Sequence, residues 1–214
     1  MIKSRFVEQF GNPIQNSMSW NEKSLTECLD GIDNGKSFVC DNVPRTENKP
    51  AVLKLSAATY GFYRPEENKA IFNESDFVDK AEVHKGDLLF TRKNTPELVG
   101  MSAYVFETPE KLMMPDLIFR LNTKDIVNKI YLWQLINHEL FRGKIQALAG
   151  GSAKSMSNIS KERLMNLKIP VPPIELQQHF AEFILQVENA KLIIKEQLVE
   201  LETLKKSLMQ KYFG

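Results

Sequence analysis

The stretch Pro172-Pro173-Ile174-Glu175-Leu176-Gln177-Gln178 opens the final segment of the chain, which then contains neither Pro nor Gly until Gly214. Apolar residues recur in this segment at a spacing of seven, at Phe180, Val187, Ile194, Leu201 and Leu208. A second row, four residues after members of the first, consists of Ile184, Leu198 and Tyr212, with Lys191 and Lys205 interrupting it. A seven-residue apolar repeat with charged flanks is typical of a helix that packs on another helix as a coiled coil.

The length of this segment decides how the chain is divided. A helix over residues 174–214 would be roughly 58 Å long at about 1.5 Å per residue, which is too long for the edge of a compact domain of this size. We therefore predict a globular domain over residues 1–173, with a short helix at its start, and a helix over residues 174–214 for dimerisation or subunit docking. The predicted interface residues are Phe180, Ile184, Val187, Ile194, Leu198, Leu201 and Leu208. The alternative is a long amphipathic helix that folds back on its own domain.

Composition restricts the functions that the domain can have. Of the 214 residues, 43% are hydrophobic and 26% are charged, which are ordinary values for a globular protein. The net charge of +1 gives no overall positive field, so a nucleic-acid site would have to be a local patch. Two cysteines and three scattered histidines argue against a disulfide framework and a zinc site, so we expect no cofactor and no metal. Without an apolar run of membrane-spanning length or a signal peptide's apolar segment, we expect a cytoplasmic protein.

The chain before the final segment mixes helical and strand patterns. Residues 1–10 predict a short helix that Gly11-Asn12-Pro13 ends, and residues 125–141 predict one amphipathic helix. Strands are predicted at residues 52–55, 88–91, 102–106, 117–121 and 167–171. Because these elements do not alternate as strand, helix, strand, we predict an α+β fold rather than a doubly wound sheet.

The start of the chain repeats its end. Lys3-Ser4 precedes Phe10-Gly11 at the same spacing at which Lys206-Ser207 precedes Phe213-Gly214. If the match is not a coincidence, the chain is one unit of a tandem repeat that begins where its predecessor ends.

Enzymatic motifs are missing from the sequence. It contains no Gly-x-x-x-x-Gly-Lys-Ser/Thr phosphate loop, and no Gly-x-Gly-x-x-Gly follows a predicted strand. Asp87 could begin a nuclease motif, but no Glu-x-Lys follows it on a strand, so we interpret it as the cap of a turn.

Two loops suggest contact with DNA. The first, Arg92-Lys93-Asn94, directly follows a predicted strand; arginine can bind guanine or phosphate in bidentate fashion, and asparagine can read adenine. The second runs from Gly150 to Ser155 and offers close backbone approach, hydroxyl groups and an amine at Gly151, Ser152, Lys154 and Ser155. Taken alone, a basic loop of this kind is more often a solvated turn than a DNA site.

Several motifs resemble one known family. They are Gly150-Gly151-Ser152, Asn158-Ile159-Ser160-Lys161 and the run from Leu167 to Gln177, together with Gly86-Asp87-Leu88-Leu89-Phe90-Thr91-Arg92 and Tyr131-Leu132-Trp133-Gln134-Leu135-Ile136-Asn137. In these motifs the chain resembles the specificity subunit of type I restriction-modification enzymes. Leu176-Gln177 stands where many members have Glu-Gln.

The resemblance implies a role and a set of partners. Members of the family usually have two target-recognition domains separated by two helices, and each domain reads one half of a bipartite DNA site. This chain resembles a half-length form with one such domain, without catalytic activity of its own. It would bind double-stranded DNA, a methyltransferase (modification) subunit and, in a complex that cleaves DNA, a restriction subunit, and would form a homodimer or pair with another half. A coiled-coil assembly protein without DNA affinity is the alternative.

Overall fold

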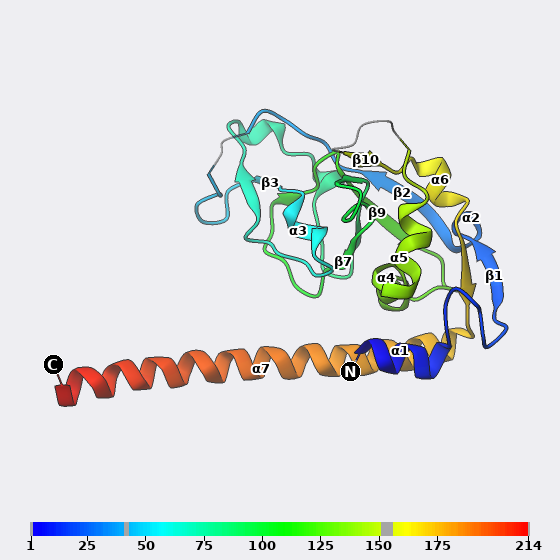
Figure 1. Ribbon diagram of the computed structural model, residues 1–214. Coiled ribbons are helices and arrows are strands. Elements are labelled where there is room, and N and C mark those ends of the chain that lie inside the picture. Colours follow the sequence, from blue (N-terminus) through cyan, green and yellow to red (C-terminus); the bar gives the residue numbers. More distant parts are fainter. Residues whose placement is uncertain (1, 41–42, 151–155, 214) are drawn as a thin grey trace.

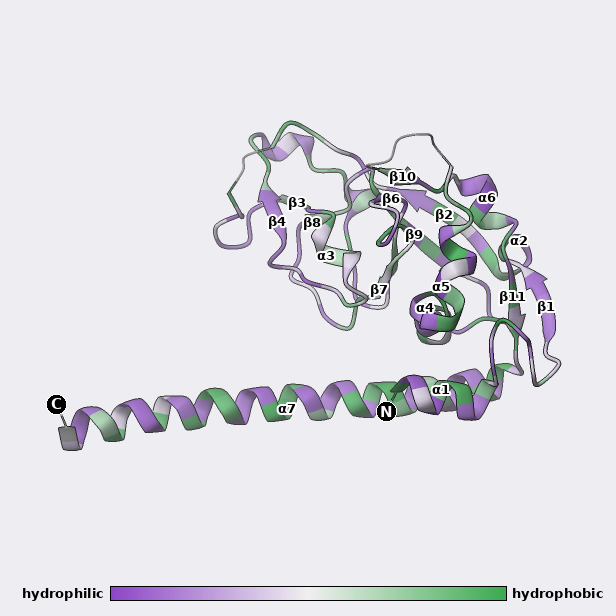
Figure 2. Cartoon of the chain, in the orientation of Figure 1, coloured by the Kyte–Doolittle hydropathy of each residue, from purple (hydrophilic) through white to green (hydrophobic). Residues whose placement is uncertain are grey.

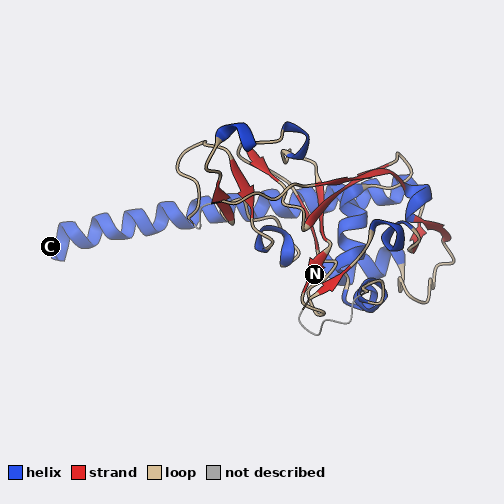
Figure 3. Cartoon of the chain, turned by 90° about the horizontal axis from the view of Figure 1, so that it is seen from above, coloured by secondary structure: helices blue, strands red, loops and turns tan. Residues whose placement is uncertain are grey.

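The computed structural model describes residues 2–40, 43–150 and 156–213, which form one α+β domain and a long C-terminal helix (Figure 1). The helix, α7 (Ile174–Phe213), begins directly after the two prolines, as predicted. It runs along one side of the domain and continues well beyond it towards the C-terminus (Figures 1 and 3).

A four-stranded antiparallel sheet forms the centre of the domain. Its order is β2 (Leu29–Asn34), β9 (Ile118–Thr123), β5 (Leu88–Thr91) and β7 (Ser102–Tyr104). The residues of β5 are all buried, because helices pack on one face of the sheet and a second layer of short strands packs on the other. The strands predicted at residues 88–91, 102–106 and 117–121 are therefore confirmed, with small shifts at their ends.

The second layer is a three-stranded sheet of β4 (Asn68–Ala70), β3 (Ala51–Leu53) and β8 (Leu112–Met113). Two further pairs complete the strands: β1 (Asn21–Ser24) with β11 (Lys168–Val171), and β6 (Lys93–Asn94) with β10 (Ser157–Asn158). The short helices are α2 (Leu25–Cys28), α3 (Ser56–Thr59), η1 (Glu74–Asp76), η2 (Asp79–Ala81) and α6 (Lys161–Met165).

The helix predicted over residues 125–141 is wrong in its extent. The structure has two helices here, α4 (Lys129–Asn137) and α5 (Glu139–Gln146), and His138 between them has an extended backbone. The His138 side chain accepts the Leu140 N–H at 3.4 Å and so caps α5. The break changes the direction of the chain, and Leu140, just after it, is 43% exposed.

The predicted N-terminal helix is α1 (Ile2–Phe10), and it ends at Gly11, whose φ of 76° suits a glycine at a helix C-terminus. It lies antiparallel to the first half of α7, because Gln9 donates to the Leu176 carbonyl while Arg5, earlier in α1, lies over the Phe183 ring. Phe6 and Phe10 pack on Phe180 with ring centroids 5.6 and 5.2 Å apart.

The two halves of α7 have different surroundings. Phe180 and Ile184 are 0% exposed in the domain's own core, and Val187 is half-buried. These first two residues are therefore unavailable to a partner, so their assignment to a partner interface is wrong. From Asn189 to Tyr212 every residue is exposed. Figure 2 shows hydrophobic residues along this half too, and the interface residues that remain accessible in it are Ile194, Leu198, Leu201 and Leu208.

Candidate nucleic-acid interface

Three strands of the central sheet meet at one edge. β2 ends at Asn34 opposite Phe119, and β5 ends at Thr91 opposite Ile118, so the start of β9 lies between the two ends. We call this the β2–β5 edge and define it by residues 34–37, 92–94, 116–119, 150 and 157–158. It lies on the side of the domain that faces away from α7 (Figure 1).

The two loops singled out in the sequence come together at this edge. β6 pairs with β10, so that Lys93 lies opposite Asn158 and Asn94 opposite Ser157. Gly150 in turn forms a β-bridge with Asn158, with hydrogen bonds of 2.9 and 3.3 Å. The residues after Thr91 are thus a short strand, not an exposed loop as predicted.

Arg92 is held in place rather than free in solvent. Its Nη2 donates to Oδ1 of Asn158 at 3.1 Å, and its guanidinium lies 5.0 Å from the centre of the Phe119 ring. The Lys161 ammonium group lies on the same ring at 5.6 Å and donates to the Ile32 carbonyl. The Arg92 Nε atom is buried and has no hydrogen-bond partner among the described residues. Two cations therefore converge on one buried aromatic ring.

Asn94 cannot read a base in this structure. It is only 7% exposed, its amide nitrogen donates to the Thr59 hydroxyl at 3.1 Å, and its oxygen accepts the Thr95 N–H at 2.9 Å. Its assignment as a DNA contact is therefore wrong, because both ends of the amide bind protein groups. Lys93, in contrast, is half-exposed at the edge.

The other predicted contacts, Gly151, Ser152, Lys154 and Ser155, lie outside the described residues. Gly150 and Met156 on either side of them are described, and Gly150 is at the edge. A Cβ at position 150 would lie 2.4 Å from Nη1 of Arg163, so the end of that flexible side chain would have to move aside.

The segment after β6 is tied down by Arg142 of α5. Its guanidinium donates to the carbonyls of Val99 at 2.6 Å and Gly100 at 2.8 Å, and burial lowers its pKa. Gly100 has a φ of 72°, and a Cβ there would be 2.3 Å from Ile145. The edge is thus built on a fixed backbone, an arrangement that sequence reasoning did not reveal.

Asp87 has the structural role predicted for it. Its carboxylate accepts the His84 N–H at 2.9 Å, which caps the turn before β5, and binds Arg120 at 3.0 Å. Arg120 also binds Asp33 at 3.1 Å. Burial would raise the pKa of Asp33, but hydrogen bonds from Asn122 and Arg120 lower it on balance. This network joins β2, β5 and β9, and no sequence motif indicated it because its members are far apart in the chain.

Two other kinds of feature are missing from the part of the chain that the structure describes. Within residues 2–40, 43–150 and 156–213, no cluster of His, Cys, Asp and Glu side chains could hold a metal ion. In the same ranges, no helix is both long and apolar enough to cross a membrane.

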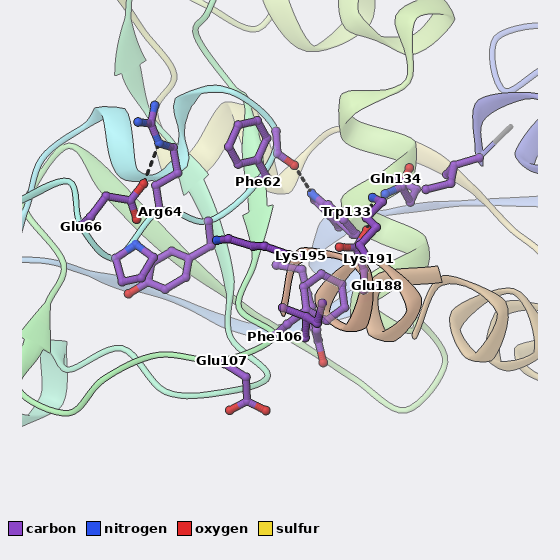
Figure 4. A pocket seen from close by; sticks show the side chains of 16 residues that line it. Phe62, Arg64, Glu66, Phe106, Glu107, Trp133, Gln134, Glu188, Lys191 and Lys195 are labelled. Atoms are coloured by element: carbon purple, nitrogen blue, oxygen red, sulfur yellow. Dashed lines mark hydrogen bonds and ion pairs between the residues drawn. The ribbon is translucent and has the colours of Figure 1, made fainter. Parts of the chain in front are cut away.

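A groove of about 680 Å³ lies between α7 and the domain, on the side away from the β2–β5 edge (Figure 4). Phe62, which is 54% exposed, Phe106 and Trp133 line the domain side. Trp133 is fixed by a 2.8 Å hydrogen bond to the Gly61 carbonyl. On the helix side lie Glu188, Lys191, Leu192 and Lys195, so the groove leads directly to the exposed half of α7.

Comparisons with known proteins agree with this architecture. Residues 20–203 match the family described as "Type I restriction modification DNA specificity domain". This chain belongs to that family. The EcoEI type I restriction enzyme specificity subunit of Escherichia coli is 32% identical over 167 residues, which are 77% of this chain and 28% of that protein. The putative MjaX specificity subunit of Methanocaldococcus jannaschii is 33% identical over 130 residues, 60% of this chain and 30% of the relative.

Solved structures of type I systems share the fold. The S subunit from M. genitalium superposes with a TM-score of 0.57 at 17% identity, covering 91% of this chain and 44% of that one. The HsdS subunit from Thermoanaerobacter tengcongensis superposes with a TM-score of 0.55 at 17% identity, and the match covers 99% of this chain and 49% of that one. The matched regions therefore cover about half of these two structures and under a third of the two curated relatives. One further neighbour, at 0.54, comes from work on complex assembly of a type I system.

Proposed function

We propose that this chain is a DNA-recognition module that gives a type I restriction-modification complex its target specificity. The observation that carries the proposal is the family match combined with the joining of the two candidate loops at the β2–β5 edge. Arg92, Lys93 and Lys161 supply positive charge there, which suits a local DNA site in a chain of almost no net charge. The module would read one half of a bipartite site.

Catalysis is assigned to partner subunits. Methyl transfer and cleavage need motifs that the sequence does not contain, and the named relatives are specificity subunits. The chain would bind a methyltransferase subunit through α7 and the adjoining groove, which lie on the other side of the domain from the DNA-binding edge. DNA and partner subunits can then bind at the same time.

DNA binding is tested with substitutions at the edge. Lys93→Ala should weaken binding to all duplexes alike and reduce the slope of log affinity against log salt by about 1, if Lys93 contacts phosphate. Lys154→Ala, which lies outside the described residues, tests the second candidate loop and should have the same effect if Lys154 contacts phosphate. Arg92→Ala should relax specificity at one position and cost about 1–3 kcal/mol of binding, and should also destabilise the domain by about 1 kcal/mol because its contacts to Asn158 and Phe119 are lost.

Lys85→Ala is the matched control, because Lys85 is an exposed lysine before the opposite end of β5 and pairs with Glu107. Fluorescence anisotropy over a salt series measures each affinity. Unchanged binding in both Lys93→Ala and Arg92→Ala would remove this edge from the DNA site. Wild-type chain that binds no duplex at low salt, alone or with a methyltransferase subunit, would favour an assembly protein instead.

Pairing of two such modules would use antiparallel α7 helices. α1 already lies antiparallel on α7, and its sequence repeats that of the end of α7. A second helix placed end to end with α1, before its first residue and along the same axis, would cover the exposed half of α7. The α7 of another module has the sequence and the direction that this position requires. A two-fold pair of this kind reads two identical half-sites in inverted orientation.

The DNA target should then be an interrupted palindrome. Half-sites read on one face of the duplex lie about 34–36 Å apart per helical turn, a distance that partly overlapped helices can span. Inserting roughly five base pairs should abolish recognition by rotating one half-site to the far face. Methylation mapping with the partner subunit would show it, and an asymmetric target would mean that the module pairs with a different half.

A further inference from the structure

One exposed amide at the β2–β5 edge has no part in the contacts described so far. Asn34 is the last residue of β2 and is exposed, unlike Asn94, which the domain's own groups occupy. Among the described residues the Asn34 side chain has no hydrogen-bond partner.

The register of the sheet places Asn34 beside the two cations. Asn34 lies opposite Phe119 in the antiparallel β2–β9 pair. Residues opposite each other in such a pair have side chains on the same face, with Cβ atoms about 4.5–5.5 Å apart. The Phe119 ring carries Arg92 at 5.0 Å and Lys161 at 5.6 Å. Asn34 therefore lies directly opposite the residue whose ring both cations contact.

The backbone that follows Asn34 is fixed. A Cβ at Gly35 would lie 2.1 Å from the Pro115 carbonyl oxygen, so only glycine fits this approach. The Gly35 N–H donates to Ile118 and the Lys36 N–H to Met114, at 3.4 and 3.0 Å. Ser37 is bound through its hydroxyl group to Asp116. Asn34 and the exposed Lys36 are thus presented on a rigid support.

We propose that Asn34 reads a base at this edge, with adenine as its partner, and that Lys36 binds the adjoining phosphate. The inference rests on the proposed function and adds a specificity-determining residue to it. In the major groove, an asparagine amide can donate to N7 and accept from N6–H of adenine at the same time, which no other base allows there. Asp116, which binds the neighbouring Ser37, offsets part of the positive charge here, so specificity gains more than affinity.

The position that Asn34 reads should adjoin the one that Arg92 reads. The ends of β2 and β5 flank β9, so they are about 10 Å apart at the usual strand spacing. That distance corresponds to roughly three base-pair steps of about 3.4 Å. Substitution of Asn34 should therefore change a position within about three base pairs of the position that Arg92→Ala relaxes.

The test is selection from a pool of duplex DNA with a randomised centre, using wild-type chain, alone and with the methyltransferase subunit. Asn34→Ala should lose the preference for adenine at one position by roughly 5- to 150-fold and keep the rest of the motif. Asn34→Asp should shift that position towards cytosine, because a carboxylate accepts from N4 of cytosine. Lys36→Ala should lower the salt slope by about 1 without changing the motif.

Asn73→Ala is the control, since Asn73 is also exposed and makes no capping hydrogen bond. Thermal unfolding of each variant shows that the domain is intact. If wild-type chain selects a motif and both Asn34 variants select the same one, the inference fails while the proposed function stands. If wild-type chain selects no motif, both fail.

Discussion

The first half of α7 and its second half continue one apolar repeat, yet they meet different neighbours. In the first half, Phe180 and Ile184 are sealed by α1 and the core of the domain. In the second half, Ile194 and Leu201, at the same heptad position as Phe180, are 56% and 60% exposed. A periodic apolar stripe thus specifies that a helix must be covered, but not which chain covers it.

The largest expected difference is in the free energy of unfolding, when alanine replaces the residue at the same heptad position in each half of α7. Phe180→Ala removes a fully buried ring that contacts Phe6 and Phe10, and should lower the free energy of unfolding by about 3–5 kcal/mol. Leu201→Ala in dilute chain should change it by no more than about 0.5 kcal/mol. Urea unfolding followed by circular dichroism measures both. Equal losses would mean that the second half also packs on the domain.

A charge placed among the exposed apolar residues of α7 should weaken association and leave the folding of the domain unchanged. Ile194→Asp or Leu201→Asp places a carboxylate in an apolar contact and should weaken self-association or subunit docking by several kcal/mol, because an unpaired charge is costly to bury. The circular dichroism spectrum of the domain should not change. Light scattering measures the size of the assembly. An unchanged oligomer for both variants would show that Ile194 and Leu201 do not belong to the interface.

Single cysteines at one heptad position should reveal the direction of pairing. In a parallel pair, Ile194→Cys, Leu201→Cys and Leu208→Cys would all bring identical residues together and cross-link. In an antiparallel pair at most one of them can, because positions seven residues from the two-fold axis lie about 21 Å from their mates, far beyond the reach of a disulfide. Oxidation and gel electrophoresis distinguish the patterns, and three equal cross-links would contradict the antiparallel arrangement.

The smallest expected effect is on the pH dependence of stability, through a buried histidine that packs on α1. His138 contacts Phe6 at 5.1 Å between ring centroids, and burial lowers its pKa below the ordinary 6.5. The unfolded chain therefore takes up the proton first, so stability is full above about pH 6.5 and decreases as the pH falls below it. His138→Asn keeps a capping residue but should lessen this decrease between about pH 7 and 5.5. His179→Asn, exposed on α7, should not.

Sequence reasoning succeeded where local rules govern the structure. The start of α7 depends on the two prolines before it, and the strand at residues 88–91 depends on a short apolar run. It failed where distant residues decide. The break at His138 allows two helices to follow the core, and Asn94 is buried because Thr59 supplies its partner. Asn34 became a candidate DNA contact only because the register of β2 on β9 places it opposite Phe119.

The exposed half of α7 also bears on how long the chain survives. Large hydrophobic side chains remain open to solvent there: Leu192, Ile193, Ile194, Leu198, Val199, Leu201, Leu204, Leu208, Met209 and Tyr212. Surfaces of this kind are bound by chaperones and cut by proteases unless another protein covers them. Surplus copies made without a companion should therefore be degraded early. The amount of this chain in a cell should therefore depend on the supply of the protein that covers this surface rather than on the chain's own rate of synthesis.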